Sequence, residues 1–402
     1  MISISDAQQI ILQQTALQSS EKVPLLQALW RIVAENIHAP RDIPAADNSA
    51  MDGYAFAIDS LADNRLTATG FLPAGDAMTE PIAPGKAVRI MTGAPVPAGC
   101  DTVVPIEDVI VNGDLIEITG KIKPGGHIRR QGEELRAGDL AIKAFSQLRP
   151  QEIGMLASFG CVSVPVFRRP RVGILATGDE LIEPGSPHQS NRLYNSNSYS
   201  IACQTAEAGA DPTLLGITGD QLANTREKIL AGLANDILIT TGGVSAGDRD
   251  YVRESIIELG GEILFWKVNM KPGKPVAFAI LKGKPVFALP GNPVAAMVAF
   301  EIFVRPAILK QMGHGLIHRP QVKAILTESL NNKGDRPHLV SVQVKLSNGV
   351  YTIDATGDQS SARLSALIAG NGLVKLEPSQ TLAAGETTSV MLLSREFETG
   401  VA

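Results

Sequence analysis

Between residues 171 and 315, short apolar runs alternate with segments of helical character, and this alternation restricts the fold more than any other feature of the sequence. Strands are expected over residues 171–175, 236–240 and 284–289, and helices over 198–208, 251–259 and 294–309. Apolar strands that alternate with helices usually form a parallel sheet with helices on both faces. The sequence therefore predicts a doubly wound parallel α/β domain over residues 171–318.

Residues on both sides of this domain have the pattern of β-strands joined by turns. Asn112-Gly113 separates two short β runs, and Asn348-Gly349 separates two more. Each Asn-Gly pair is typical of a two-residue type I′ hairpin. We therefore expect a β domain over residues 44–140 and a small β-barrel-like domain at the C-terminus, over residues 319–402.

The remaining segments have helical patterns. Helices are expected over residues 5–17, 25–37 and 151–159. Ser5 and Gln8 have the spacing of a capping box at the start of the first helix. The β domain would thus be inserted into a helical linker domain made of residues 1–43 and 141–170.

Composition and charge exclude several kinds of partner. The chain has 402 residues, a net charge of −5 and 4% aromatic residues, so neither a basic field nor stacking platforms favour nucleic acid. No apolar run approaches the roughly 18 residues of a membrane-spanning helix, and no signal peptide follows Met1. The three cysteines form no C-x-x-C pair, which disfavours a disulfide framework or a thiolate zinc site. We expect a cytoplasmic protein that binds neither nucleic acid nor a membrane.

Glycines and carboxylates gather in the loops after predicted strands, which is where ligands bind in α/β sheets. One such loop contains Gly242 and Gly243, which let the backbone approach a ligand closely, and Ser245, a hydroxyl donor. Its Asp248 and Asp250 would repel a bare phosphate, so a Mg²⁺ ion between these carboxylates and an anion is the better explanation. A tight turn with an aspartate helix cap is the simpler alternative.

Two further strand-end loops carry carboxylates. Thr177-Gly-Asp-Glu180 has two adjacent carboxylates, more than a helix cap needs, and Glu180 is the better candidate for a functional one. Asp220 follows another short β run, where a helix cap is an equally good explanation.

A lysine-rich loop follows later in the same domain. Lys267, Lys271 and Lys274 fall within eight positions, and the prolines among them forbid a helix. A rigid loop would aim the ammonium groups at one place, although a solvated run of charge is an alternative. Pro290 and Pro293 stiffen the next strand-end loop, and Pro293 suits the first turn of a helix.

Together these loops predict a site for a phosphate-linked substrate, handled with Mg²⁺ by positioning and electrostatics.

Seven motifs occur in one order along nearly the whole chain. They are Asp47-Asn-Ser-Ala-Met-Asp-Gly-Tyr-Ala55, Arg89-Ile-Met-Thr-Gly-Ala-Pro-Val-Pro97, Gly132-Glu-Glu134, Thr177-Gly-Asp-Glu180, Thr241-Gly-Gly-Val-Ser245, Lys271-Pro-Gly-Lys-Pro275 and Leu289-Pro-Gly-Asn-Pro293. With this set the chain resembles the molybdopterin molybdenumtransferase family, which includes the MoeA-type proteins and the E domain of gephyrin. The set in this order is highly specific, although each motif alone is not.

The resemblance implies an enzyme that converts adenylylated molybdopterin and molybdate into molybdenum cofactor and AMP, assisted by Mg²⁺. It also implies cytoplasmic homodimers, in which the β domain of one subunit completes a site on the α/β domain of the other. The α/β domain itself resembles the molybdopterin adenylyltransferases, and such an enzyme is the expected supplier of the substrate. The division into four domains agrees with the four-part architecture of the family.

The same resemblance assigns the site residues. The catalytic residues would be Asp52, Thr92, Glu180, Asp220 and Asp250. Substrate and molybdate would be bound by Gly242, Gly243, Ser245, Lys267, Lys271, Lys274, Pro290, Pro293, Arg336 and Ser361. Mg²⁺ would be held by Asp250 with Asp248 or Glu180, and Glu134 is a further candidate.

Two positions depart from the family pattern. Glu134 stands where the family usually has an aspartate, so its carboxylate is displaced by about one methylene. Arg336 is offset by Asp335, and Ser341 occupies the place of a second arginine. Arg336 nevertheless stays a candidate molybdate ligand.

Two other functions remain open. One is the preceding adenylyltransferase reaction, which would consume ATP with molybdopterin alone; the β domain with its Met51-Asp-Gly-Tyr54 motif argues against it. The other is a scaffold that binds a partner peptide, as the gephyrin E domain also does. That use would need an exposed groove at a dimer face.

Overall fold

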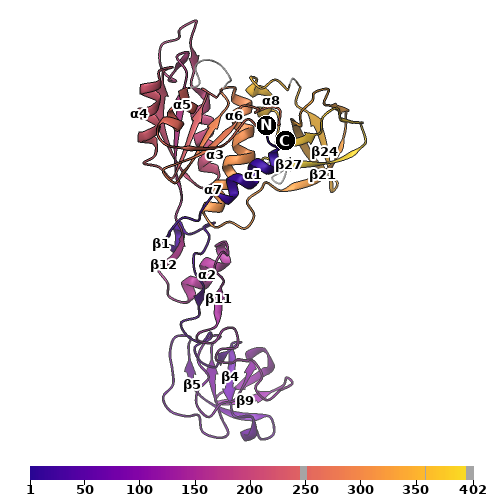
Figure 1. Ribbon diagram of the computed structural model, residues 1–402. Helices are drawn as coiled ribbons and strands as arrows, with labels where there is room; N and C mark the ends of the chain where they lie inside the picture. The colour runs from indigo at the N-terminus through magenta and orange to yellow at the C-terminus, as the bar shows by residue number, and fades with distance from the viewer. Residues whose placement is uncertain (245–250, 358, 395–402) are drawn as a thin grey trace. The chain divides into compact units, whose positions relative to one another are not determined.

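The computed structural model describes residues 1–244, 251–357 and 359–394, and the chain divides into two compact units (Figure 1). The first unit consists of Met1–Lys22 and Pro165–Ala402, and the second consists of Val23–Val164. The second unit is therefore inserted, in sequence, between two parts of the first.

The core of the first unit is a six-stranded sheet with the strand order β16-β13-β17-β20-β19-β18. Its strands are β13 (Arg171–Thr177), β16 (Asp211–Thr218), β17 (Ile237–Thr241), β18 (Glu262–Trp266), β19 (Ala277–Leu281) and β20 (Lys284–Leu289). The four strands β16, β13, β17 and β20 run parallel, as predicted.

The sheet departs from the predicted parallel arrangement at one edge. Strand β19 runs antiparallel to both β18 and β20. Only Lys282 and Gly283 join β19 to β20, and both have positive φ (50° and 75°), the geometry of a type I′ turn. So short a connection joins antiparallel neighbours, because a parallel crossover needs a dozen or more residues.

Helices cover both faces of the sheet, as predicted (Figure 1). They are α1 (Ile4–Gln13), α3 (Ser196–Glu207), α4 (Leu222–Gly232), α5 (Tyr251–Glu258), α6 (Pro293–Ala299) and α7 (Arg305–Gln311), with a π-helical turn (Phe300–Val304) before α7. Within β17, Ile237 and Ile239 pack in the core formed with α1, α3, α6 and α7, and Leu238 packs in the core formed with α4 and α5. Burial on both faces explains why the first three residues of this strand are all apolar.

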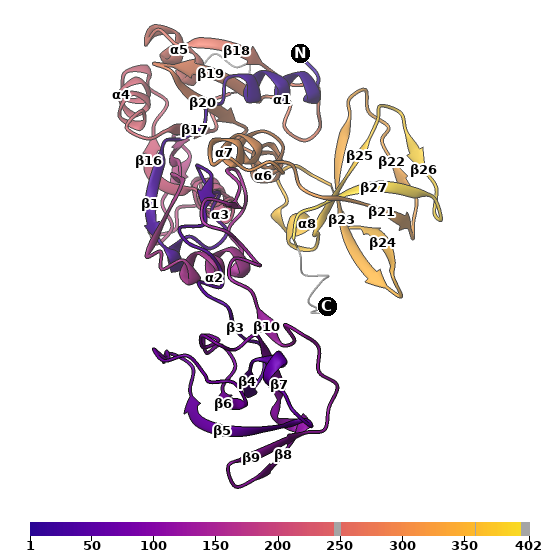
Figure 2. The same cartoon turned by 90° about the horizontal axis from the view of Figure 1, so that it is seen from below.

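The C-terminal part of the first unit is a closed barrel with the strand order β21-β24-β23-β25-β27 (Figure 2). Its strands are β21 (Gln321–Leu326), β23 (His338–Ser347), β24 (Val350–Ala355), β25 (Gly372–Leu376) and β27 (Thr387–Leu392), beside the pair β22 (Leu330–Asn331) and β26 (Thr381–Leu382) and the helix α8 (Leu364–Ile368). The predicted hairpin is confirmed: Ser347 pairs with Val350 across Asn348 and Gly349, which both have positive φ.

The second unit contains a six-stranded sheet with the order β7-β4-β6-β5-β9-β8. Its strands are β4 (Gly53–Phe56), β5 (Arg65–Leu72), β6 (Lys86–Ile90), β7 (Thr102–Pro105), β8 (Val109–Asn112) and β9 (Leu115–Ile118). The hairpin predicted near Asn112 is present, but Asn112 pairs with Leu115, so the turn residues are Gly113 and Asp114. Only Gly113 has positive φ, so the predicted type I′ turn is wrong there.

The predicted helix over residues 25–37 is also wrong. Only a 3₁₀ turn forms, over Leu25–Gln27, and the chain then bonds to a distant segment. The Trp30 amide donates to the Leu148 carbonyl at 2.7 Å, and the Val33 amide donates to the Ser146 carbonyl at 3.0 Å. These long-range partners replace the local bonds of a helix, which a local pattern could not reveal.

The other elements of this region are short. They are β1 (Ser20–Pro24) with β12 (Ser163–Phe167), β2 (Ile37–His38) with β11 (Leu140–Ile142), β3 (Asn48–Ser49) with β10 (Ile128–Arg129), and α2 (Pro150–Ser158). The helix α2 is confirmed. The capping box at Ser5 is wrong, because Ser3 caps α1 and its hydroxyl accepts from the Asp6 amide at 3.0 Å.

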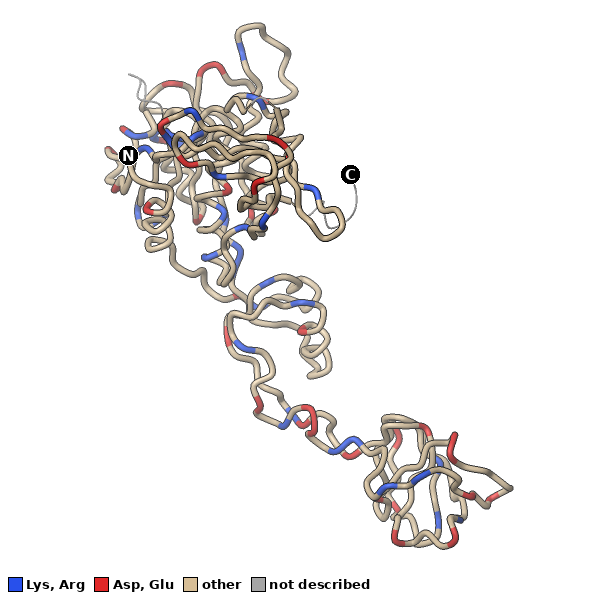
Figure 3. Tube along the Cα trace, turned by 90° about the vertical axis from the view of Figure 1, so that its right-hand side faces the viewer, with Lys and Arg blue, Asp and Glu red and all other residues tan. Residues whose placement is uncertain are grey.

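Charged residues are distributed along the whole chain. Figure 3 shows lysines and arginines interspersed with acidic residues throughout the described trace. No helix of the described part is both long and apolar enough to cross a membrane.

Two neighbouring residues of α5 test how the sheet is covered. Ile256 is 1% exposed and packs under α5, whereas Ile257 is 53% exposed. Ile256→Ala should lower the free energy of unfolding by about 2–5 kcal/mol, because it leaves a cavity in the core. Ile257→Ala should change it by about 0.5 kcal/mol or less. Urea unfolding followed by circular dichroism measures both, and equal effects would contradict this packing.

Candidate active site

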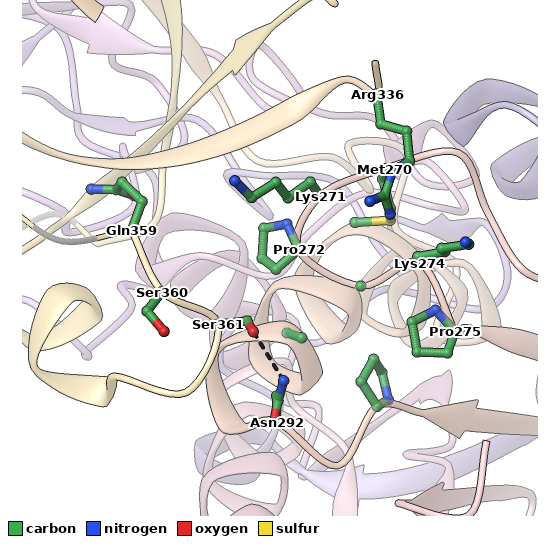
Figure 4. Close-up of a pocket in the computed structure, with 13 residues that line it drawn as sticks. Met270, Lys271, Pro272, Lys274, Pro275, Asn292, Arg336, Gln359, Ser360 and Ser361 are labelled. Atoms are coloured by element: carbon green, nitrogen blue, oxygen red, sulfur yellow. Dashed lines mark hydrogen bonds between the residues drawn. The ribbon is translucent and has the colours of Figure 1, made fainter. Parts of the chain in front are cut away.

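A cavity of about 500 Å³ lies where the lysine-rich loop of the α/β domain meets the barrel domain (Figure 4). Three sources line it: the loop between β18 and β19, the start of α6, and two segments of the barrel domain. The lining residues are Met270, Lys271, Pro272, Gly273, Lys274, Pro275, Pro290, Asn292, Ala295, Arg336, Gln359, Ser360 and Ser361. Of the residues predicted to bind the substrate, five therefore lie around one cavity: Lys271, Lys274, Pro290, Arg336 and Ser361.

The lysine-rich loop is held in place by main-chain bonds on two sides. Within the loop, the Val268 amide donates to the Lys274 carbonyl at 3.0 Å. Toward the barrel domain, the Lys271 amide donates to the Pro337 carbonyl at 2.8 Å, and the Leu339 amide donates to the Lys271 carbonyl at 2.7 Å. These bonds fix the main chain of the loop. A fixed main chain is needed if the lysine side chains are to point to one place. Lys267 does not line the cavity.

The cavity is cationic. Lys271, Lys274 and Arg336 line it, and the described lining residues include no carboxylate. Asp335 lies 3.5 Å from the Arg336 guanidinium, but its side chain is 91% exposed, so water screens this pair. Three cationic side chains with no carboxylate among the described lining residues favour an anionic ligand.

The segment 359–361 closes one side of the cavity and is fixed at two points. The Gln359 amide group bonds to the main chain of Ser341: its oxygen accepts from the Ser341 amide at 2.8 Å, and its nitrogen donates to the Ser341 carbonyl at 3.2 Å. At the other end, Asn292 Nδ2 donates to Ser361 Oγ at 2.9 Å (Figure 4). Ser341 is thus buried beneath this segment.

The glycine-rich loop after β17 runs close to two other strand ends. The Gly242 amide donates to the Leu289 carbonyl at 3.1 Å, and Gly242 has φ of 85°. A Cβ atom on Gly242 would lie 2.6 Å from the Thr177 carbonyl oxygen, so no other residue fits here without a shift. A Cβ atom on Gly291, between two lining residues of the cavity, would lie 3.6 Å from the Gly242 Cα. The glycine loop and the cavity are therefore neighbours.

The acidic loops after β13 and β16 reach the same edge of the sheet. The Gly178 amide donates to the Thr218 carbonyl at 3.1 Å, and the Asp220 amide donates to Asp179 Oδ1 at 3.0 Å. Glu180 is exposed. Glu180 and Asp220 therefore lie at the edge that also carries Gly242 and Gly243, outside the lining of the cavity.

Several buried oxygen atoms at this edge have no hydrogen-bond partner among the residues that the structure describes. They are Thr240 Oγ1 and Thr241 Oγ1 at the end of β17, and Asn197 Oδ1 and Ser198 Oγ at the start of α3. Asn197 Nδ2 donates to the Gly291 carbonyl at 2.7 Å, which places this helix start beside the glycine loop.

In the second unit, Asp52 and Thr92 contact each other directly. Asp52 Oδ1 accepts from the Thr92 hydroxyl at 2.6 Å and from its amide at 2.7 Å. These bonds, the hydroxyl first, hold the pKa of Asp52 below its usual value. Asp52 is therefore an anion at neutral pH. Glu134 is exposed in the same unit, and its amide donates to the Ile43 carbonyl at 3.1 Å.

Family models cover most of the chain. Residues 2–160 match the MoeA N-terminal region (domain I and II), residues 173–310 match a probable molybdopterin binding domain, and residues 323–393 match the MoeA C-terminal region (domain IV). A molybdopterin molybdenumtransferase of Haemophilus influenzae is 35% identical over 397 residues, which are 97% of this chain and 98% of that protein.

The chain belongs to the MoeA family. A molybdopterin molybdenumtransferase of Bacillus subtilis is 34% identical over 94% of this chain and 90% of its own length. The crystal structure of a molybdopterin biosynthesis MoeA protein from Pyrococcus horikoshii superposes with a TM-score of 0.85 at 27% identity, covering 98% of this chain and all of that one. The expected family and the expected multidomain fold are confirmed.

Three of the residues predicted for this MoeA-family site, Ser245, Asp248 and Asp250, lie outside the described residues. Within the described part of the chain, no group of three or more His, Cys, Asp or Glu residues is arranged to hold a metal ion. Pro293 is the first residue of α6, as predicted, but does not line the cavity.

Sequence reasoning missed three side chains near this MoeA-family cavity. Asn292 and Gln359 hold the segment 359–361 in place. The buried His338 pairs with Lys271 in an isolated β-bridge. Asn292 belongs to the motif Leu289-Pro-Gly-Asn-Pro293, in which only the two prolines were predicted to have a role. His338 Nε2 has no hydrogen-bond partner in residues 1–244, 251–357 and 359–394, and burial, with the charge of Lys271, lowers the His338 pKa to about 4.

The lowered pKa of His338 predicts a pH dependence of stability. Its folded-state pKa of about 4 lies below the ordinary value of 6.5, so the unfolded chain binds the proton first as pH falls. His338 should therefore contribute a loss of about 1–2 kcal/mol in the free energy of unfolding between pH 6.5 and pH 4, after allowance for screening.

Urea unfolding at several pH values measures this loss. His338→Gln should show a shallower decline than the parent chain. The matched control is His188→Gln, because the His188 side chain is exposed. Identical declines in the parent and in His338→Gln would contradict the assignment.

Proposed function

We propose that this protein is a molybdopterin molybdenumtransferase that inserts molybdate into adenylylated molybdopterin and releases AMP, in the last step of molybdenum cofactor synthesis. The observation that carries the proposal is the cavity in which Lys271, Lys274, Arg336 and Ser361 meet. Its support from relatives is that curated family members of similar length bear this name.

The cavity suits molybdate, which is a tetrahedral dianion. Two ammonium groups and a guanidinium group supply charge, and the Ser361 hydroxyl supplies a directional bond. The anion would be held by charge-assisted bonds inside a recess, where they are stronger than in open water. Lys267, which belongs to the same loop, would add to the positive electrostatic potential at the cavity.

The neighbouring sheet edge suits the pterin and its phosphates. Gly242 and Gly243 let the substrate approach the backbone, and Ser245 would donate a hydroxyl bond. The buried oxygens of Thr241 and Ser198, which have no partner within the described part of the chain, supply further polar atoms at this edge. Pro290 and Pro293 would keep the adjoining loop rigid, so that the substrate and molybdate are held next to each other.

We also propose that Mg²⁺ assists the reaction. Asp250 would hold it with Asp248 or Glu180, and Glu134 is the further candidate. Of these, Glu180 supports the proposal, because it is an exposed carboxylate at the sheet edge, the hard oxygen donor that Mg²⁺ prefers. A bound Mg²⁺ neutralises charge on substrate phosphates.

The remaining catalytic assignments are proposals of the same kind. Asp220 would position the substrate at the sheet edge. Asp52, anionic and fixed by Thr92, would position water or metal from the β domain. Asp52 and the cavity belong to different compact units, so we propose a homodimer in which the partner's β domain completes each site. We also propose that the protein is cytoplasmic and that a molybdopterin adenylyltransferase delivers its substrate.

The proposal is tested by AMP release from adenylylated molybdopterin in the presence of molybdate and Mg²⁺. Lys271→Ala should lower kcat/KM for molybdate by about tenfold to a hundredfold, because a charge-assisted bond to the anion is lost. The matched control is Lys228→Ala, whose ammonium group donates to the Leu215 carbonyl at 3.2 Å, away from the cavity. If the parent chain releases no AMP, the proposed function is wrong.

The metal assignment has its own test. Asp250→Ala should abolish Mg²⁺-dependent AMP release while circular dichroism shows an unchanged fold, because the ion loses its main proposed ligand. Asp59→Ala, which removes a carboxylate from a 3₁₀ turn of the second unit, is a control for loss of charge. Continued turnover by Asp250→Ala would contradict the assignment.

A further inference from the structure

Asn332 is a buried asparagine whose side chain binds the main chain of the loop that carries Arg336. It follows β22 in the barrel domain and is 3% exposed. Its Oδ1 accepts from the Gly334 amide at 3.1 Å, and its Nδ2 donates to the Arg336 carbonyl at 2.8 Å. The same nitrogen donates to the Glu377 carbonyl at 2.9 Å, just after β25. One amide group therefore fastens the loop 332–336 to the body of the barrel.

The main chain at Arg336 is held on both sides. The Arg336 carbonyl accepts from the Asn332 side chain, and the carbonyl of the next residue, Pro337, accepts from the Lys271 amide at 2.8 Å. Of these two bonds, the one from Asn332 is made by a side chain, so a substitution can remove it. Asn332 is not among the described residues that line the cavity. Its effect on a ligand there would therefore pass through Arg336.

The direction of the Arg336 side chain matters because a competing carboxylate is next to it. Arg336 lines the cavity and extends toward the lysine-rich loop (Figure 4). Asp335 Oδ1 lies 3.5 Å from Arg336 Nε, on a side chain that is 91% exposed. Rotation of the main chain at residues 335 and 336 would let the guanidinium follow this carboxylate into solvent. A bond that fixes the Arg336 carbonyl opposes that rotation.

We propose that Asn332 is a positioning residue, which holds the main chain of Arg336 so that the guanidinium stays in the cavity and binds the oxyanion. The inference rests on the proposed function, since it concerns the anion of the same cavity. A binding group whose main chain is already fixed loses less conformational freedom when the ligand arrives, so affinity rises without a new contact. Burial of the Asn332 amide is compatible with this role, because Gly334, Arg336 and Glu377 satisfy its hydrogen bonds.

The test is a double-mutant cycle, read by isothermal titration calorimetry of the full chain with molybdate at pH 8. Arg336→Ala should weaken molybdate binding by about tenfold to a hundredfold, and Asn332→Ala should weaken it by about fivefold to twentyfold. In the Arg336→Ala background, Asn332→Ala should add less than about twofold, because no guanidinium is left to position. A full additional loss in that background would overturn the proposal, as would a parent chain that binds no molybdate.

Urea unfolding of the same four proteins separates positioning from stability. Asn332→Ala should lower the urea midpoint equally with and without Arg336, since the lost bonds are the same in both backgrounds. Asn235→Ala is the matched control: Asn235 is 7% exposed, and its Nδ2 donates to the Gly232 carbonyl at 3.0 Å before the start of β17, at the other end of the sheet. It should lower the midpoint and leave molybdate affinity unchanged. If it weakens molybdate binding as much as Asn332→Ala does, loss of stability explains the effect and the proposal is wrong.

Gly334→Ala tests the same role without opening a cavity in the barrel. Gly334 is exposed, and a Cβ atom there would lie 3.3 Å from Asn332 Oδ1, so the amide has to shift by a few tenths of an ångström. Molybdate binding should weaken by about twofold to fivefold in the parent chain and stay unchanged in Arg336→Ala. Should Asn332→Ala not fold, this variant decides alone, and unchanged affinity in the parent chain would refute the role of Asn332.

AMP release by the same variants separates this inference from the proposed function. Asn332→Ala should raise KM for molybdate and leave kcat nearly unchanged, since the residue acts on anion binding. A parent chain that shows the coupling between Asn332 and Arg336 in molybdate binding but releases no AMP would remove the proposed function and leave the role of Asn332 intact. A parent chain that releases AMP but whose molybdate affinity ignores Asn332 would do the reverse.

Discussion

The main-chain bridge between Lys271 and residues 337–339 is the interaction on which the cavity depends. The cavity takes its cations from two domains: Lys271 and Lys274 from the loop between β18 and β19, and Arg336 from the barrel domain. Two short bonds at Lys271 join these sources. Main-chain bonds fix position without side-chain freedom, so like charges can be held together at small entropic cost.

A protein with a net charge of −5 can therefore bind anions by local means. The described lining of the cavity has three cations and no carboxylate, while acidic residues lie at the sheet edge beside it. Glycine at 242 lets the main chain pass within contact distance of Thr177, and this compactness keeps the acidic edge and the cationic cavity adjacent. The separation of positive and negative side chains over a few residues decides which ligand can bind, and the net charge of the whole chain does not.

The sequence allowed prediction wherever local chemistry decides the structure. The Asn348-Gly349 turn, the strand–helix alternation and the rigid lysine-rich loop all follow from residue types at fixed spacing. Local reasoning failed where distant segments decide: residues 25–37 bond to residues near 146 instead of forming a helix. Likewise, Asn292 and Gln359 carry no signal in the sequence, because their importance comes from Ser361 and Ser341, which are 69 and 18 residues away.

The packing around Ser341 connects these observations. A Cβ atom on Gly370 would lie 2.3 Å from the Ser341 hydroxyl oxygen, so the space between these two residues is already filled. Ser341 instead offers its main chain to Gln359, which brings the segment 359–361 over the cavity. These two bonds and the bond between Asn292 and Ser361 hold the segment 359–361 beside the three cations. This side of the cavity therefore depends on main-chain and amide contacts between distant residues, and not on attraction between charges.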